Sequence, residues 1–586
     1  MNGALIILVG VACFTFAYFV YSRFVARAIG VDPSVKTPAH TMRDGIDYVP
    51  AHPMVLYGHH FAAIAGAGPI IGPVLASQFG WAAVVLWIVI GCIFIGSVHD
   101  MVTLFLSVRH EGKSIGSVIE GVLGRSGKMI FLMFCFAALV LVMAVFTGQV
   151  ATAFVSNPEV ATSSLLGIFE AALFGVCVYK FRWNVFAASF VFVPLLFLLV
   201  WIGVVFPCDL TAVFGMSKEA AYMAWVVVLF AYCFVASTLP VWLLLQPRDY
   251  LNSYLLYAML AIGLTAVFVT CPSININAFS GFAVKAAAGG SQMNVFPLLF
   301  VTVACGACSG FHALVASGTT SKQLDNESHI RPIGYGCMLL EGVVALLALV
   351  AVAWHSQEDL VAGLASGKPV VFFAQGLASF CGKMGLPEKT SESFMLLAVA
   401  AFLMTSVDAC TRLARFVWQE MWSTASASAA EPSARSPLPV PRPSLVVRVN
   451  RNMYFATAVV VAIGVYLLIF NQSMAKHLWT LFGSANQMLA TLTLLTATLW
   501  LFKSRRNFWI VLLPMCFMMV TAGTAVFQLF MQNVDKWLSD GFEAGGVTAI
   551  AAGVLFVLAI VLLALGALKI RRLVRMRIAR HIAGKD

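Results

Sequence analysis

The stretch Val55–Phe79, V-L-Y-G-H-H-F-A-A-I-A-G-A-G-P-I-I-G-P-V-L-A-S-Q-F, is long and apolar enough to cross a lipid bilayer. Three glycines and two prolines interrupt its middle: Gly66, Gly68, Pro69, Gly72 and Pro73. In a helix interior these five residues cost on the order of 9 kcal/mol relative to alanine. Irregular backbone at membrane depth is tolerated only where it is buried or lines a polar cavity. The pattern therefore predicts a broken helix; close packing of small residues against a neighbouring helix is the alternative.

The composition of the whole chain is that of a membrane protein. Its 586 residues are 61% hydrophobic and 10% charged, and the mean hydropathy is +0.92. We expect an all-α polytopic protein with about fifteen transmembrane helices, in which the net charge of +11 reflects membrane topology and not nucleic-acid binding. The predicted spans are 3–22, 55–79, 81–108, 129–154, 163–180, 183–206, 220–245, 253–271, 295–317, 331–355, 392–412, 453–471, 478–502, 508–531 and 546–568.

The distribution of basic residues predicts the orientation. If the N-terminus is outside, the odd-numbered spans end in the cytoplasm, and the inner segments then hold 29 of the 36 Lys and Arg residues. An excess of Lys and Arg in cytoplasmic loops is the positive-inside pattern. We therefore predict an outside N-terminus and a cytoplasmic C-terminus. No charged region precedes the first apolar run, so we expect no cleavable signal peptide.

A low-complexity stretch and a second candidate break suggest how the chain is divided. Ser423–Pro443 is rich in Ala, Ser and Pro and is predicted to be a flexible, then proline-stiffened, linker. The span 220–245 contains Ser237, Thr238 and Pro240, which predict an interruption. Interrupted helices in corresponding positions of two halves indicate a transporter built from an inverted repeat. The predicted units are an N-terminal helix and cytoplasmic loop (1–54), two five-helix repeats of opposite orientation (55–206 and 207–422), a cytoplasmic linker (423–452), four accessory helices (453–568) and a basic cytoplasmic tail suited to anionic lipid (569–586).

Four stretches closely resemble the carbon starvation protein family: D-G-I-D-Y-V-P (Asp44–Pro50), G-H-H-F-A-A-I-A-G-A-G-P-I-I-G-P-V-L-A (Gly58–Ala76), Q-P-R-D-Y-L-N-S-Y-L (Gln246–Leu255) and A-C-G-A-C-S-G-F-H-A-L-V-A-S-G-T-T (Ala304–Thr320). The resemblance implies a secondary transporter of the bacterial inner membrane. Family members are described as peptide transporters and as pyruvate–proton symporters. The family is placed with transporters of the leucine-transporter fold, which implies a five-plus-five inverted-repeat core with extra N- and C-terminal helices.

In a leucine-transporter-like arrangement the substrate lies at the breaks of the first and sixth core helices, which here are spans 55–79 and 220–245. The half-helix that starts near Pro69 would direct free amides and a positive dipole end at a substrate carboxylate. His59 and His60 lie near the cytoplasmic entrance of this helix and are expected to shape a gate. The expected substrate-binding residues are Ala65, Gly66, Ala67, Gly68, Ser237 and Thr238.

Acidic residues inside spans are costly and are therefore candidates for carrying a coupling ion. Asp100 has no basic residue within one helical turn and is the main candidate for the proton, with Glu170 and Glu341 as alternatives. His312 is a further candidate, because histidine side chains in general titrate near physiological pH; a packed, hydrogen-bonded histidine is the other interpretation. Ser309 could contribute to an oxygen cage for sodium, the alternative coupling ion.

One further acid is interpreted as structural. Asp408 and Arg412 are four residues apart on a predicted helix, a spacing that favours an ion pair. Cys305 and Cys308 have the spacing of a metal or redox motif, but no second pair accompanies them in that apolar span. We expect neither a metal nor a cofactor.

The favoured function is secondary active import of a small carboxylate-bearing nutrient, pyruvate or short peptides, by proton symport with alternating access. A transmembrane nutrient sensor and a membrane redox subunit are the alternatives. An enzyme is not expected, because the chain has no region large enough for a soluble catalytic domain. No Walker motif is present, which argues against ATP-driven pumping. The expected partners are the substrate, the coupling ion and membrane lipid.

The charge pattern predicts that the segment Lys569–Lys585 is cytoplasmic. A cysteine introduced there should react with a membrane-impermeant thiol reagent only after the cells are permeabilised. Labelling of that cysteine from the periplasm of intact cells would contradict the predicted orientation.

Overall fold

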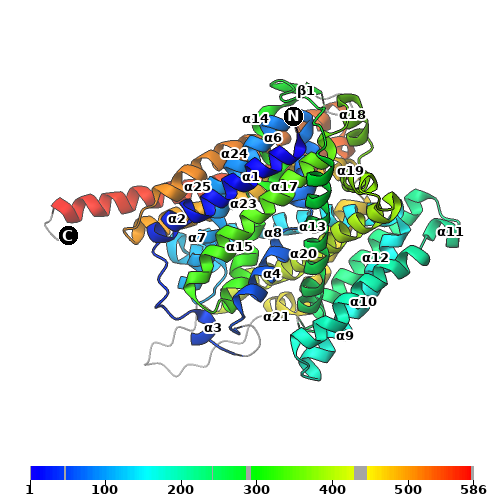
Figure 1. The fold of residues 1–586 in the computed structure, drawn as a ribbon. Helices are drawn as coiled ribbons and strands as arrows, with labels where there is room; N and C mark the ends of the chain where they lie inside the picture. The colour runs from blue at the N-terminus through cyan, green and yellow to red at the C-terminus, as the bar shows by residue number, and fades with distance from the viewer. Residues whose placement is uncertain are drawn as a thin grey trace.

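The computed structural model describes residues 2–44, 48–240, 242–285, 292–427, 445–470 and 472–582, and helices dominate them (Figure 1). One small antiparallel sheet is present in this described part, formed by β1 (Ala283–Lys285) and β2 (Gln292–Asn294), with Val284 opposite Met293. The expectation of an all-α polytopic membrane protein is confirmed.

The helices of the first half, with π and 3-10 segments labelled η, are α1 (Gly3–Phe19), α2 (Tyr21–Ile29), α3 (Pro38–Thr41), α4 (Pro53–Ile64), α5 (Gly68–Ala76), η1 (Ser77–Phe79), α6 (Trp81–Gly91), η2 (Cys92–Gly96), α7 (Ser97–Arg109), α8 (Ile115–Ser156), α9 (Pro158–Gly175), η3 (Val176–Lys180), α10 (Val185–Val205), α11 (Leu210–Phe214), α12 (Lys218–Thr238) and α13 (Leu245–Thr270). Those of the second half are α14 (Val295–Val303), η4 (Ala304–Gly306), α15 (Phe311–Val315), η5 (Ala316–Thr320), α16 (Ser321–Gln323), η6 (Glu327–His329), η7 (Arg331–Gly336), α17 (Cys337–Ala353), α18 (Gln357–Ala365), α19 (Pro369–Lys383), α20 (Glu388–Ala427), α21 (Leu445–Arg451), α22 (Met453–Val465), η8 (Tyr466–Phe470), α23 (Gln472–Lys503), α24 (Trp509–Asp540) and α25 (Phe542–Ile582).

The expected count of about fifteen spans is not confirmed. Within the described residues, twelve helices are long and apolar enough to cross a membrane, or up to fourteen if each of two bent pairs is one span. The expected span 295–317 is not among them. Its apolar sequence is divided between α14, η4, α15 and η5, none of which is long enough to cross by itself.

The first predicted break is confirmed. Helix α4 ends at Ile64, α5 begins at Gly68, and the two are bent by 45°. A Cβ atom on Gly68 would lie 2.6 Å from the Cβ and Sγ atoms of Cys305, and one on Gly72 would lie 2.3 Å from the carbonyl oxygen of Val303. The glycines are therefore needed for the close approach of α5 to α14 and η4.

The second break lies in another helix than expected. Helix α12 runs without interruption from Lys218 to Thr238, and Pro240 falls in the connection to α13, so the predicted interruption of span 220–245 is wrong. The helix that is interrupted is 295–320, where residues 307–310 separate η4 from α15. Proline after a helix end is common because it cannot continue the helix, so Pro240 marked an end and not a break.

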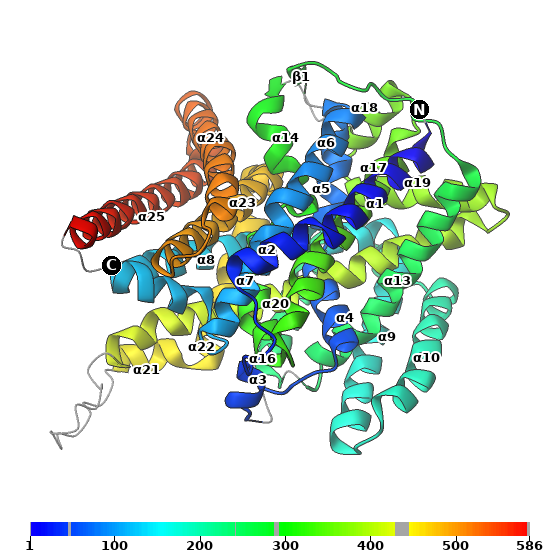
Figure 2. The same cartoon turned by 60° about the vertical axis from the view of Figure 1, so that its left-hand side comes forward.

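The centre of the molecule is formed by helices that bury most of their surface. These are α17, α20, α23 and the long α8, and α8 packs directly on both α20 and α23. Two helix groups lie on opposite sides of this centre, α24 with α25 on one side and α9 with α10 on the other (Figure 2). Both broken helices are thus enclosed by protein, as interrupted backbone in a membrane requires.

The predicted linker 423–452 is only partly accessible to description, because residues 428–444 lie outside the described residues. Its two ends are helical: α20 continues to Ala427, and Leu445–Arg451 forms α21. The four accessory helices expected over 453–568 correspond to α22, α23, α24 and α25. Helix α25 continues into the predicted tail as far as Ile582, and residues 583–586 lie outside the description.

The contact between α5 and α14 yields a stability prediction. Replacing Gly72 by alanine should destabilise the fold by about 1–3 kcal/mol, because the added methyl group meets backbone that cannot move aside. Gly121→Ala is the matched control, since no atom lies within 4 Å of the Cβ position there. The check is thermal unfolding of the purified proteins in detergent, and equal melting temperatures for the two variants would contradict the close packing.

Candidate functional site

A small cavity lies where the two broken helices meet. Its wall combines the first break with residues of α8, η4, α15, α20 and α23, and consists of Ile64, Gly66, Gly68, Val142, Phe146, Cys305, Phe311, Ser406 and Phe482. The hydroxyl oxygen of Ser406 is buried and has no hydrogen-bond partner in the described structure. An unpaired hydroxyl and the ends of a broken helix are groups that can bind a polar ligand.

The two half-helices that begin at the breaks differ at their N-termini. At the start of α5, Pro69 has no amide hydrogen, and the amides of Ile70 and Ile71 donate to the carbonyl oxygen of Ala67 at 3.1 and 2.8 Å. Among these first described positions of the helix, the amide of Gly68 is the one left for a ligand. In α15, the amide of Phe311 donates to Asn486 Oδ1 at 2.9 Å, and the amide of Gly310 donates to the carbonyl oxygen of Asn486 at 3.1 Å. Residue Asn486 of α23 therefore caps α15, whereas the start of α5 faces the cavity.

Beside this cavity lies a buried cluster of one aspartate and two histidines. Both oxygens of Asp100 are engaged: Oδ1 lies 2.7 Å from His99 Nδ1, and Oδ2 lies 2.7 Å from His312 Nδ1. All three side chains are fully buried. A carboxylate that accepts two hydrogen bonds requires a proton on the Nδ1 atom of each histidine, which assigns the ring tautomers.

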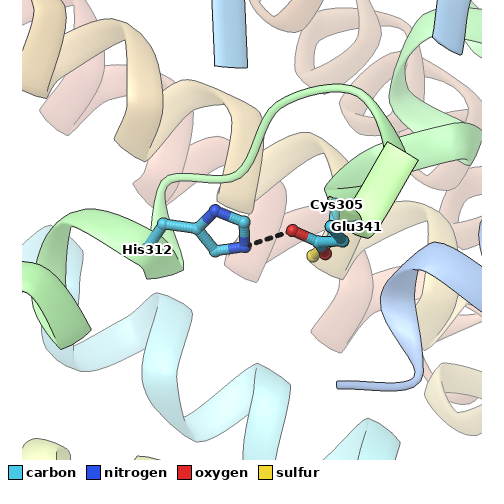
Figure 3. Close-up of side chains that lie close together, drawn as sticks. All are labelled: Cys305, His312 and Glu341. Carbon is cyan, nitrogen blue, oxygen red and sulfur yellow. Dashed lines mark ion pairs between the residues drawn. The ribbon is translucent and has the colours of Figure 1, made fainter. Parts of the chain in front are cut away.

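The other ring nitrogen of His312 faces Glu341. Nε2 of His312 and Oε2 of Glu341 are 3.3 Å apart, and Glu341 is also fully buried (Figure 3). Neither carboxyl oxygen of Glu341 nor this Nε2 has a hydrogen bond within the described residues. Two lone pairs at this separation repel each other, so one proton belongs between the two groups, on the imidazole or on the carboxyl. The cluster therefore has a position that holds a proton.

The thiol of Cys305 lies beside this position. One ligand atom each from Cys305, His312 and Glu341 fall within 4.8 Å of one another, which is close enough to hold a metal ion. The thiol is already used, however, because Sγ donates to Ser309 Oγ at 3.3 Å and accepts from Asn486 Nδ2 at 3.4 Å. A metal requires the thiolate, so these contacts favour a neutral thiol and a proton site.

Segments of π-helix flank each element of the cluster. η2 precedes α7, η5 follows α15 and η7 precedes α17. Each π-helix inserts an extra residue into a turn and rotates the side chains that follow, and such insertions are frequent at functional sites. The segments η2 and η7 thus help to direct Asp100 and Glu341, which follow them, toward His312, which precedes η5.

Several expected site residues are brought together. Asp100, His312 and Glu341 form the cluster, Ser309 joins it through Cys305, and Gly66 and Gly68 line the cavity. Ala65 and Ala67, the other expected binding residues at the break, flank Gly66. The two histidines near the gate differ, since His60 is buried with Nδ1 at 2.8 Å from Thr320 Oγ1, whereas His59 is half-buried.

Other expected residues lie elsewhere. Ser237 and Thr238 end α12 and do not line the cavity, and Thr238 Oγ1 donates to carbonyl oxygens of its own helix. Glu170 lies on the peripheral helix α9, where both of its carboxyl oxygens are without a partner among the described residues. Sequence reasoning missed Asn486 and Ser406, for which the only signal was a polar residue within an apolar span.

The predicted pairing of Asp408 with Arg412 is corrected. Asp408 Oδ2 is paired with Arg248 Nη1 of α13 and accepts a hydrogen bond of 2.7 Å from the hydroxyl of Tyr232. The guanidinium of Arg412 donates through Nη2 to the carbonyl oxygens of Ala236 and Leu239. A four-residue spacing allows a pair but does not require it, and here the C-terminus of α12 offers Arg412 carbonyl oxygens and a favourable dipole end.

Comparison with known proteins decides the family. The family model described as "Carbon starvation protein CstA" matches residues 2–366 and 355–525. The chain belongs to the carbon starvation protein family. Within this family it is 33% identical to the "Peptide transporter CstA" of Campylobacter jejuni, over 88% of this chain and 78% of the relative. It is 30% identical to the "Pyruvate/proton symporter BtsT" of Escherichia coli, over 90% of this chain and 82% of the relative.

These relatives are named as transporters and not as enzymes, and this carbon starvation family protein is a multi-pass membrane transporter. Among solved structures, a mutant of the manganese transporter of Eremococcus coleocola is similar, with 13% identity, a TM-score of 0.44 and coverage of 93% of this chain and 99% of that chain.

The corrected ion pair yields a prediction. Arg248→Met should lower the yield of folded protein, because an unpaired buried Asp408 costs about 3–5 kcal/mol. The double variant Arg248→Met/Asp408→Leu should recover most of this yield, as measured by size-exclusion chromatography. Arg412→Met/Asp408→Leu is the matched control and should not recover it, because Arg412 binds the end of α12. If only Arg412→Met/Asp408→Leu recovered the yield of folded protein, the pairing of Asp408 with Arg412 expected from the sequence would be correct.

Proposed function

We propose that this carbon starvation family transporter imports a small carboxylate-bearing nutrient by proton symport with alternating access, in the bacterial inner membrane. The observation that carries the proposal is that the buried proton position between His312 and Glu341 lies next to the cavity at the two helix breaks. Cys305 lines the cavity and packs closely against Gly68, and it also lies beside His312 and Glu341. A substrate and a proton can thus be bound within one enclosed region.

The proposed substrate site is the cavity lined by Gly66, Gly68 and Ser406. The amide of Gly68 and the positive dipole end of α5 would bind a carboxylate, and Ser406 would donate to it. Pyruvate, which the name of one relative includes, is smaller than the peptides named for others and needs less room in this buried site, so we propose pyruvate as the substrate.

The proposed proton site is His312 between Asp100 and Glu341. Two carboxylates and one imidazolium would leave a net negative charge in a fully buried place, which is unfavourable. A second proton neutralises the group. Because the titration of such neighbours is shared, the proton belongs to the cluster and not to one residue. Entry of a substrate anion nearby would favour protonation, which couples the two fluxes.

Alternating access would require movement at the breaks. The loop residues 65–67 and 307–310 are the points where each half-helix can change direction. His60 is the proposed gating residue, because its hydrogen bond with Thr320 joins α4 of the first broken helix to η5 of the second. The outside N-terminus and cytoplasmic C-terminus expected from the basic residues complete the proposal. Sodium is the alternative ion, with Ala65, Gly66, Ser309 and nearby hydroxyl groups of the span 295–317 as its ligands.

The proposal predicts which variants lose proton coupling. In proteoliposomes free of sodium, an inward proton gradient should drive accumulation of labelled pyruvate. Asp100→Asn and Glu341→Gln should abolish accumulation but retain exchange of pyruvate, because the proton position is altered while the cavity is intact. Glu170→Gln is the matched control, since it removes a buried acid that is not part of the cluster.

Two results would contradict this proposal. Uptake that vanishes without sodium, and returns with sodium at zero proton gradient, would assign coupling to sodium. Full accumulation by Asp100→Asn together with loss in Glu170→Gln would move the proton site to α9. Uptake of a labelled dipeptide in the same vesicles, competing with pyruvate, separates the two substrate classes.

A further inference from the structure

A second cavity lies between α9, α10, α13 and α20, away from the helix breaks. Apolar side chains from all four helices form most of its wall, among them Ile168, Leu196, Leu255 and Leu397. The polar lining groups include Ser164, Arg248 and Asn252. An apolar pocket with a few polar groups on one side is the usual form of a small-molecule site.

The guanidinium of Arg248 has one edge engaged and one edge without partners. Its Nη1 atom contacts Asp408 Oδ2 and the hydroxyl of Tyr232. Its Nε and Nη2 atoms have no hydrogen-bond partner in the described residues, although Arg248 is 97% buried. Nε–H and Nη2–H point the same way from the planar group, and their spacing matches the two oxygens of a carboxylate. The unengaged edge is therefore the one suited to bidentate binding.

The other polar groups of the cavity are consistent with an acidic ligand. Ser164 on α9 is buried, and its hydroxyl has no partner within the described part of the chain. Asn252 is already used, since Nδ2 donates to Thr405 Oγ1 at 3.1 Å and to the carbonyl oxygen of Ala401 at 3.3 Å. The groups left to bind a ligand are thus a charged fork and one hydroxyl, which are both donors.

We propose that this cavity is a second carboxylate-binding site, with Nε and Nη2 of Arg248 as the bidentate donors and Ser164 as a further donor. The ligand is a small monocarboxylate whose apolar part packs against the leucine and isoleucine side chains. The choice of pyruvate as the ligand rests on the proposed function, but the site does not.

Helix α20 connects this site to the cavity at the breaks. It carries Ser406 at the first cavity and Asp408 at the ion pair with Arg248. A carboxylate on the free edge of Arg248 competes electrostatically with Asp408 and so acts on the helix that forms the wall of the first cavity. Occupancy of the second site thus influences binding at the first.

The test is equilibrium dialysis of labelled pyruvate against the purified full-length protein in nanodiscs. We expect two sites per chain. Val200→Phe should fill the second cavity and remove one site, because Val200 lines it from the peripheral helix α10. Leu198→Phe on the same helix is the matched control; its side chain is exposed, and both sites should remain. Arg248→Lys keeps the charge but not the fork, and should raise the Kd of one site about tenfold.

Three outcomes overturn the proposal: one site per chain in the unmodified protein, two sites of unchanged affinity in Val200→Phe, or equal binding of pyruvate methyl ester, which has no carboxylate. Thermal unfolding of each variant separates loss of a site from loss of the fold. Binding and uptake are independent measurements, so two bound pyruvates without proton-driven uptake would overturn the proposed function alone. Proton-driven uptake with a single bound pyruvate would overturn the second site alone.

Discussion

Backbone amides and carbonyls at membrane depth must find partners within the protein, and the two interrupted helices meet this requirement together. Gly68 and Gly72 bring α5 into direct contact with η4 and α14, where any larger residue would collide with Cys305 or with backbone. Asn486 of α23 then caps the start of α15. Asn486 is thus a polar side chain in the core that satisfies the backbone at a helix break. The central helices enclose both interrupted helices.

The same enclosure determines the chemistry available to the site. Asp100, His312 and Glu341 are fully buried and belong to three different helices. In such surroundings each unbalanced charge is costly, so the protonation of one group depends on its neighbours and on any ligand that enters. The proposed coupling between a proton and an anionic substrate would follow from placing both within one low-dielectric region.

Helix α20 is the element that relates the centre to the periphery. Ser406 and Asp408 are two residues apart, so their side chains lie on nearly opposite faces of the helix, one toward the broken helices and the other toward α13. Arg412, one turn further, binds the end of α12. Helix α20 therefore lines both cavities and also contacts α12 and α13.

The sequence by itself determined the membrane class, the all-helical fold and the break at Gly66–Pro69, because each depends on local properties: apolar length, hydrogen bonding within one segment, and the poor helix propensity of Gly and Pro. The lone acids Asp100 and Glu341 and the histidine His312 could also be selected from the sequence, since charged groups in apolar spans are costly. The tertiary structure decided which of them meet, that the second break lies at 307–310, and that Asp408 binds Arg248 and not Arg412. These outcomes depend on which helix faces which neighbour, and the local pattern of a span contains no information on the partner that will satisfy its polar groups.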